Sequence, residues 1–384
     1  MQIGINESEN STSLDHKLAP MLLFHYNYDM SLEESDDDQD NEESGDDEDV
    51  SDEDEFTEAS DDEESMEETD DDETDASSND NDDDTANDEG KEVNDTLLLY
   101  SISSKQLLAN SKLNYLKDHF YWITPQGWLL MVHRDSHETF LWNPFTSQRI
   151  SLPFDQDRFL RTNYTRCLLS CKPTDTNCVV LVLSLNDTVI WYCYPGGTQW
   201  FKHEYQSRRF HRHRGSVIGY MALLTVVGGK FYTGLGDSVI TLDFSPNPKF
   251  DIIPIKAVQN PMYNFSRLYL LESSGELFSL FFYPPMTCPK RIAEIEVYKL
   301  DIQRRAWVKV YTLGDRAFFV NSTKCFGASV SAKEACLEEN CIYFSRTGDK
   351  GLYVHSMERG TTAALNPGED FLDNVAAEIL MPAP

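Results

Sequence analysis

Three closely spaced cysteines are the first residues of this sequence that could do chemistry. Cys167, Cys171 and Cys178 could supply thiolate ligands to a zinc ion, which takes four ligands in tetrahedral geometry. Their spacing, with three and six intervening residues, is not that of a zinc knuckle, and no second pair lies at a suitable distance. Because Cys171 and Cys178 stand at the ends of β-rich runs, we interpret the group as buried thiols. The sequence predicts no metal site and no other cofactor.

Other catalytic patterns in the sequence are incomplete. The triplet His133-Arg134-Asp135 matches part of a kinase catalytic loop, but the downstream Asn, the metal-binding motif and the Gly-rich loop are missing. His137 would share a face with His133 only on a helix, and this stretch has a strand and turn pattern. The run 226–230 lacks the first Gly and the Ser or Thr of a phosphate-binding loop. These gaps predict that the protein is not an enzyme.

A strongly acidic tract contains candidate modification sites. Residues 33–95 hold 36 of the 66 acidic residues and a single base, Lys91. A phosphate on one of its serines would add about −1.5 to −2 charges. We expect the tract either to bind basic proteins such as histones or to act only as a solvating spacer. Five serines have an acid three positions on, as an acid-directed kinase requires: Ser35, Ser44, Ser51, Ser60 and Ser65.

One dense basic cluster offers a complementary surface. Arg208, Arg209, Arg212 and Arg214 could contact phosphate or nucleic acid, could bind the acidic tract within the chain, or could line an ordinary solvated loop. A nucleic-acid site would favour interleaved aromatic residues, and only Phe210 is present. The acidic tract would also repel a phosphate backbone. The sequence therefore disfavours nucleic acid as a partner.

The acidic tract also predicts the domain organisation. Residues 96–384 contain 26 acids and 30 bases, so the tract accounts for the whole net charge of −34. Such a tract cannot bury enough apolar surface to offset its ordering entropy. Strand-like runs at 18–26 and 97–102 flank it. We expect a disordered N-terminus at 1–17, a first strand within 18–30, a disordered acidic insertion at 31–95, and the rest of one β domain at 96–384.

The sequence carries no sign of secretion or membrane insertion. Its N-terminus has neither a basic region nor an apolar region of a signal peptide. No apolar run approaches the ~18 residues of a spanning helix. The eight cysteines are scattered among strand-like segments, which favours reduced thiols over a disulfide framework. We expect a cytoplasmic or nuclear protein without a membrane partner.

Strand patterns dominate the rest of the chain. Helical periodicity is scarce, whereas short β-rich runs separated by Gly, Pro, Asn and Asp recur in sets of four. Gly228-Gly229 between two runs predicts a tight hairpin, because both positions then need a positive φ. The six tryptophans recur at similar positions, which favours packing over a ligand cage. The sets begin at 119, 166, 222, 267 and 326, and the last comprises 326–330, 341–345, 352–355 and 361–364.

Five such sets predict an all-β β-propeller. The remaining runs, 18–26, 97–102, 106–110 and 377–381, make a sixth set from both ends of the chain. Pairing the two ends in one blade closes the ring and removes free strand edges. We therefore expect six four-stranded blades, with a pair of β-sandwiches as the alternative.

Several motifs resemble those of a plant β-propeller family of unknown function, the KIB type, which often follows an F-box. Three motifs resemble its first full blade and three resemble its late region, in the same order and spacing. The resemblance covers about residues 18–28 and 96–384. The motifs are Gly127-Trp128-Leu129-Leu130, Trp142-Asn143-Pro144-Phe145-Thr146, Ile150-Ser151-Leu152-Pro153, Trp307-Val308-Lys309-Val310, Leu313-Gly314-Asp315-Arg316-Ala317-Phe318-Phe319 and Asn340-Cys341-Ile342-Tyr343-Phe344.

The resemblance implies a recognition platform that selects a substrate for a Skp1–cullin ubiquitin ligase. Only about 17 residues precede the first strand, fewer than an F-box needs, so the conventional Skp1 contact is expected to be absent. The leading hypothesis is a non-enzymatic protein-binding propeller whose acidic loop tunes interaction with basic partners, the partner itself being unidentified. The alternatives are a ligase adaptor whose F-box comes from a separate protein, an enzyme that uses the propeller channel, and a degenerate gene copy.

Overall fold

The fold is described from a computed structural model. The structure describes residues 19–25, 97–108, 115–161, 165–205, 221–235, 237–244, 247–258, 266–284, 292, 294–322, 324–346, 350–365, 367 and 376–383. All of them belong to one unit, Met1–Met30 with Asn94–Pro384, whereas the second unit, Ser31–Val93, lies outside the described residues. The predicted disorder of residues 1–17 and 31–95 therefore also falls outside them.

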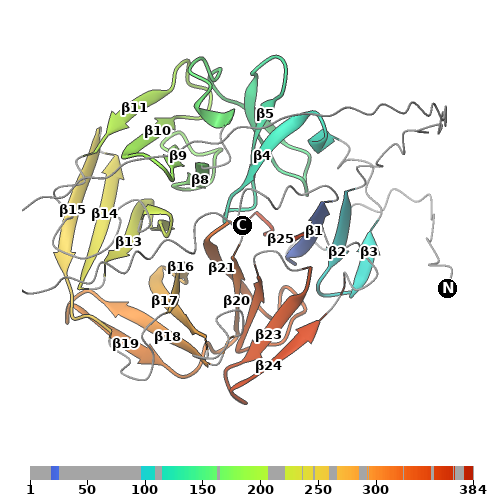
Figure 1. The fold of residues 1–384 in the computed structure, drawn as a ribbon, viewed down its shortest axis with the longest axis vertical. Helices are drawn as coiled ribbons and strands as arrows, with labels where there is room; N and C mark the ends of the chain where they lie inside the picture. Colours follow the sequence, from blue (N-terminus) through green and yellow to red (C-terminus); the bar gives the residue numbers. More distant parts are fainter. Residues whose placement is uncertain are drawn as a thin grey trace, which may run out of the picture. The chain divides into compact units, whose positions relative to one another are not determined.

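Six β-sheets follow one another around a ring, and we number them as blades 1 to 6 (Figure 1). Blade 1 has the order β25 (Ala376–Leu380), β1 (Met21–His25), β2 (Leu98–Ser101) and β3 (Gln106–Leu108). Blade 2 comprises β4 (His119–Ile123), β5 (Leu129–His133), β6 (Thr139–Trp142) and β7 (Arg149–Ser151). Blade 3 comprises β8 (Thr165–Leu169), β9 (Val180–Ser184), β10 (Val189–Cys193) and β11 (Phe201–Glu204). A short 3-10 helix, η3 (Phe159–Arg161), lies between β7 and β8.

The other three blades complete the ring. Blade 4 comprises β12 (Thr225–Val227), β13 (Lys230–Leu235), β14 (Ser238–Phe244) and β15 (Pro248–Pro254). Blade 5 comprises β16 (Arg267–Ser273), β17 (Glu276–Tyr283), β18 (Glu294–Asp301) and β19 (Ala306–Val310). Blade 6 has the order β21 (Phe326–Ser331), β20 (Arg316–Asn321), β22 (Cys341–Ser345), β23 (Leu352–Ser356) and β24 (Thr361–Leu365). The predicted six-bladed all-β propeller is confirmed.

Each blade runs from the centre of the ring to its rim. The outermost strands β3, β7, β11 and β24 are mostly exposed, whereas middle strands such as β9 are almost wholly buried. Alternate side chains of a middle strand face opposite neighbours, because successive residues of a strand point to opposite faces. In β9, Val180 and Val182 pack toward blade 2, and Leu181 and Leu183 pack toward blade 4. This double burial explains why these strands are continuous apolar runs.

The ring is closed by strands from the two ends of the chain. β25 pairs in antiparallel fashion with β1, which places Glu378 opposite Leu23. β1 pairs on its other side with β2, with Phe24 opposite Leu98. Residues 26–96 therefore connect two adjacent strands of one sheet, as the sequence predicted. The two ends of the chain are thus joined in one sheet, which closes the ring, as propellers do to protect their strand edges.

Blade 6 departs from the four-stranded expectation. The predicted set began with 326–330 next to 341–345, but β20 lies between β21 and β22 and is parallel to β22. The run Ala317–Val320 is apolar and buried, so it must join the sheet, although the sequence interpretation treated it only as a motif. Cys325, with φ 52°, lies in the tight turn from β20 to β21. The chain thus enters this blade at its second strand and then folds back toward the centre.

Three smaller predictions can also be compared with the structure. Gly228 and Gly229 have φ values of 56° and 82° between β12 and β13, which confirms the tight hairpin. Trp128 and Trp142 are buried in the core, and Trp191 stacks on Phe159 at 4.2 Å between ring centroids, so these tryptophans pack. Among the residues that the structure describes, no helix is long and apolar enough to cross a membrane.

Candidate functional site

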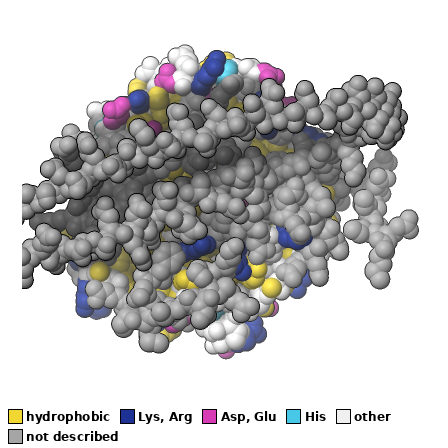
Figure 2. Space-filling view, in the orientation of Figure 1, with side chains coloured by type: hydrophobic (Ala, Val, Ile, Leu, Met, Phe, Trp, Pro, Cys, Tyr) yellow, Lys and Arg dark blue, Asp and Glu magenta, His cyan; other side chains and the backbone are white. Residues whose placement is uncertain are grey.

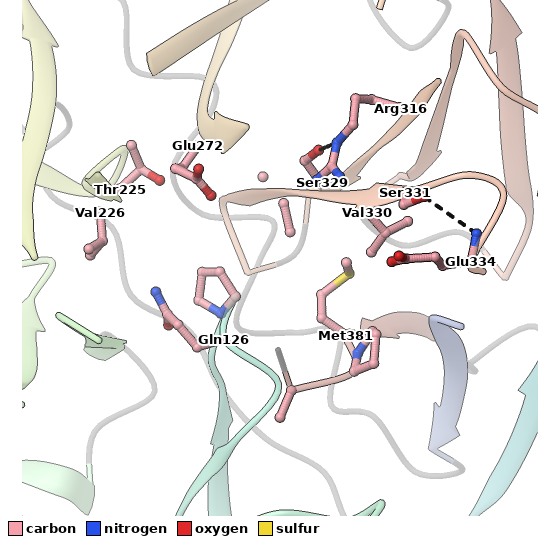
Figure 3. A pocket seen from close by; sticks show the side chains of 15 residues that line it. Gln126, Thr225, Val226, Glu272, Arg316, Ser329, Val330, Ser331, Glu334 and Met381 are labelled. Carbon is pink, nitrogen blue, oxygen red and sulfur yellow. Dashed lines mark hydrogen bonds between the residues drawn. The ribbon is translucent and has the colours of Figure 1, made fainter. Parts of the chain in front are cut away.

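A cavity of about 290 Å³ lies at one end of the central channel (Figure 3). It is lined by the inner strands β12, β16 and β21, by the turn that follows β4, and by the segment that follows β25. Its wall therefore comes from blades 1, 2, 4, 5 and 6, which are distant in sequence. A site of this kind exists only when the ring has closed.

The cationic group of the cavity is Arg316, the first residue of β20. Its Nε donates a hydrogen bond to Ser329 Oγ at 2.9 Å. Ser329 Oγ also lies 2.9 Å from Ser273 Oγ of blade 5, so the contact joins two blades. No carboxylate from the described part of the chain lies at ion-pair distance from Arg316. Its guanidinium is half-buried and keeps other N–H donors for a ligand.

Two carboxylates lie on other sides of the same cavity. Glu272 of β16 accepts a hydrogen bond from the backbone N–H of Gly275 at 2.6 Å, which fixes its orientation. Glu334, just after β21, is exposed, and its backbone N–H donates to Ser331 Oγ at 3.4 Å. Figure 3 shows these groups around the cavity, which Gln126, Val226 and Met381 also line. The lining thus offers charge of both signs, hydroxyls, an amide and apolar surface.

The segment after β25 is packed closely against the turn between β4 and β5. Gly127 in this turn has φ 77°, and a Cβ there would lie 2.5 Å from the Ala383 backbone nitrogen and 2.6 Å from the Met381 carbonyl oxygen. Neither contact could relax by a side-chain rotation, because both atoms belong to the backbone. Gln126 next to it accepts a hydrogen bond from the Leu169 N–H at 3.4 Å through Oε1. Gly127 is therefore required for the C-terminal segment to line the cavity.

This arrangement is suited to hydrogen bonding rather than to covalent chemistry. The partners of Ser329 are Arg316 and Ser273, whereas an activated serine needs a base such as His. No group of three or more His, Cys, Asp or Glu could hold a metal ion among the residues described. A polar extended segment, with donors and acceptors along its backbone, fits such a mixed lining.

The sequence-predicted site residues all lie outside the part of the chain that the structure describes. Arg208, Arg209, Arg212 and Arg214 lie between β11 and β12 in chain order, and they fall outside the described residues. The candidate phosphorylation sites also fall outside them: Ser35, Ser44, Ser51, Ser60 and Ser65. Their proposed contacts remain predictions.

The cysteines and His133 have structural surroundings. Cys167 and Cys178 are buried free thiols, and Cys178 Sγ donates to the Cys171 carbonyl oxygen at 3.3 Å. Burial raises the pKa of the Cys178 thiol to about 12 and also raises that of Cys167. A raised thiol pKa disfavours the thiolate that a metal requires. His133 Nδ1 accepts hydrogen bonds from the N–H groups of Asp135 and Ser136, so the kinase-like triplet is a hairpin turn.

Sequence reasoning missed the residues that line the cavity. Arg316 lies within the late motif 313–319, and this motif was the signal that could have found it. Ser273, Ser329 and Glu272 carry no pattern of their own, since their roles depend on which blades lie next to one another. Only the closed ring brings them together.

The six blades and the cavity between their inner strands define the protein as a β-propeller. The sequence profile of the KIB1-4 beta-propeller family matches residues 99–362, and the protein belongs to this family. The chain is 27% identical over 237 residues to F-box protein At4g00893 of Arabidopsis thaliana, covering 58% of this chain and 55% of that protein. It is 26% identical over 270 residues to F-box/kelch-repeat protein At1g57790 of Arabidopsis thaliana, covering 68% of each. It thus spans just over half the length of the first of these relatives.

Proposed function

We propose that the protein is a non-enzymatic recognition propeller that binds another protein at the cavity end of its channel. The observation that carries this proposal is the mixed lining of the cavity, with Arg316 free of an acidic partner among the described residues. Membership of a propeller family with F-box relatives supports a protein-binding role. Within the cavity, Arg316 and Glu272 would pair with opposite charges of the partner, and the hydroxyls would bind its backbone.

The acidic tract would tune this recognition. With 36 acids in residues 33–95, it would attract basic partners over a distance set by salt screening. Such long-range attraction changes association rates and specificity more than final affinity. We therefore propose basic proteins as the preferred partners, in the cytoplasm or the nucleus.

The rim is the other surface that could contribute. Large hydrophobic side chains are exposed on it, among them Phe154, Ile252 and Tyr311. Figure 2 shows hydrophobic, Lys and Arg side chains interspersed on the described part of one face. Because these exposed residues are scattered singly, they fit the general surface of a soluble domain better than a binding patch.

The proposal is tested by affinity capture from plant extract at physiological salt with the full chain. Three baits are compared: the unchanged protein, Arg316→Met, and Lys249→Met, whose side chain is exposed and pairs with Asp251. We expect a protein retained by the first and third baits to be lost with Arg316→Met, and to bind the purified chain directly. Equal retention by all three baits would contradict a role for the cavity.

The same capture experiment also tests the role of the acidic tract and the alternative of a ligase adaptor. A variant that lacks residues 31–95 should keep the partner but bind it more slowly, with a weaker dependence on salt. Loss of the partner from that variant would instead make the tract the binding element and the propeller its scaffold. Recovery of Skp1 or a cullin together with an F-box protein would favour the alternative of a ligase adaptor.

A further inference from the structure

Cys171 and Cys178 face each other across the first two strands of blade 3. β8 pairs with β9 in antiparallel register, and the N–H of Ser170 extends this ladder by donating to the Val179 carbonyl oxygen at 3.0 Å. The next residues outward, Cys171 and Cys178, are therefore opposite each other. The side chains agree with this register, because Sγ of Cys178 donates to the Cys171 carbonyl oxygen at 3.3 Å.

The place of the two cysteines in the ladder suits a disulfide. Ser170 and Val179 form a hydrogen-bonded pair, and such pairs alternate with non-hydrogen-bonded ones, whose Cα atoms lie about 4.5 Å apart. The backbone N–H of Cys178 donates to the Asp175 carbonyl oxygen and not across the ladder, as expected of a non-hydrogen-bonded position. A disulfide needs Cα atoms between about 4.4 and 6.8 Å apart, so this position allows one.

The two thiols are in contact in the reduced protein. Both cysteines are free in the structure. Burial raises the pKa of Cys178 to about 12, and a hydrogen bond with the Cys171 thiol is a smaller cause in the same direction. On the other side, Ser170 Oγ donates weakly to Cys171 Sγ at 3.8 Å, so this sulfur is held beside the ladder.

The two cysteines differ in their access to solvent. Cys171 is half-buried, whereas Cys178 is fully buried. An oxidant in solution can therefore reach Cys171, and Cys178 can react only with a group that the protein places beside it. Cys167, earlier on β8, lacks this arrangement, because it is buried and lies opposite Val182.

We propose that Cys171 and Cys178 form a reversible disulfide by exchange with a low-molecular-weight disulfide, R–S–S–R. The Cys171 thiolate attacks one sulfur of the oxidant, which forms a mixed disulfide and releases one R–S⁻. The Cys178 thiolate then attacks the Cys171 sulfur, which forms the bond between the two cysteines and releases the second R–S⁻. Two electrons pass to the oxidant, and the two thiol protons end on two molecules of R–SH.

The disulfide would lie next to the lining of the cavity. The N–H of Leu169, two residues before Cys171, donates to Gln126 Oε1 at 3.4 Å, and Gln126 lines the cavity. The new bond would close residues 171–178 into a covalent loop and hold the end of β8 against β9. The proposal stands independently of the proposed function, because blade 3 alone contains the reacting groups.

The test brings the folded full chain to equilibrium with reduced and oxidised glutathione, and then blocks the remaining thiols. Digestion with a protease that cleaves before aspartate separates the two cysteines at Asp175, so their disulfide keeps two fragments joined until reduction. By mass spectrometry, we expect joined fragments to exceed glutathione-bound Cys171 by roughly tenfold or more, because the second thiol is held in place. The exposed Cys336 should instead carry glutathione.

Matched variants identify the sulfur atoms that react. Cys171→Ala should abolish the joined fragments, whereas Cys167→Ala should leave them unchanged, although both cysteines lie on the same fragment. Should Cys171→Ala fail to fold, Cys178→Ala decides, with the same loss expected. An absence of joined fragments from the unchanged protein, or their persistence in the Cys171 or Cys178 variant, would overturn the proposal.

Discussion

Two arginines in different blades, Arg316 at the cavity and Arg166 on the innermost strand of blade 3, have different surroundings. Arg316 at the cavity is half-buried, and its Nε donates to Ser329 Oγ. Arg166 on β8 is buried, and its Nε has no hydrogen-bond partner among the described residues. A half-exposed guanidinium keeps part of its hydration, whereas a buried one depends on protein or ligand groups. The remaining donors of Arg316 are therefore open to a ligand, whereas Arg166 Nε is enclosed by the protein.

The largest expected effect is a loss of stability, and it compares a glycine packed against the cavity segment with a glycine in an open turn. Gly127→Ala should destabilise the protein by about 3 kcal/mol or more, because positive φ strain adds to a clash with the backbone of 381–383. Gly196→Ala is the matched control, since Gly196 has φ 73° but open space around its Cβ position, and should cost about 1 kcal/mol. Urea unfolding measures both, and equal losses would show that the C-terminal segment does not pack here.

The next effect concerns a buried charge that does have a partner. Glu378 is 3% exposed and pairs with Lys324, so Glu378→Ala should destabilise the ring by about 2–3 kcal/mol, discounted because Lys324 reaches solvent. Glu276→Ala, which breaks an exposed pair with Lys299, should change stability by less than about 0.5 kcal/mol. Thermal unfolding with the double variants measures each coupling, and similar couplings for both pairs would argue against a structural role of Glu378.

Removing the unpaired charge should have the opposite sign. Arg166→Met should raise stability by about 1–2 kcal/mol, because a buried cation is replaced by an apolar side chain. Arg316→Met should lower stability by about 1 kcal/mol through the lost bond to Ser329. The melting temperatures of the two variants measure these opposite effects. A shift of the melting temperature in the same direction for both variants would contradict the prediction.

The smallest effect is a dependence on mild acid. Burial lowers the pKa of His119, at the start of β4, and of His355 in blade 6. Between the folded pKa and 6.5 the unfolded chain binds more protons, so stability falls as the pH drops below 6.5 and levels off below the folded pKa. His119→Gln should reduce this loss by about 1 kcal/mol or less at pH 5. Urea midpoints at pH 7 and 5 measure it, and an unchanged difference would exclude His119 as a contributor.

Much of the fold could be predicted from the sequence, but few of the residues that line the cavity could be. Apolar runs such as 180–183 and turns such as Gly228-Gly229 are local signals, so strands, blade count and ring closure follow from them. The position of β20 does not, because the motif 313–319 indicates a strand without saying beside which strand it pairs. Arg166 looks like an ordinary strand residue in sequence. Its burial depends on blade 4 lying beside blade 3, and no local pattern contains that information.

β1 is held in the ring by its pairing and burial as well as by its covalent link to β2. Met21, Leu22, Leu23 and Phe24 are each no more than 1% exposed between β25 and β2, yet residues 26–96 are their covalent link to β2. A single peptide-bond cleavage within that link would leave the strand held by two hydrogen-bonded ladders and by core packing alone. Such a cut would divide the propeller into a piece that carries β1 and a piece that carries the other strands, and loss of the piece with β1 would open the propeller at its closing blade.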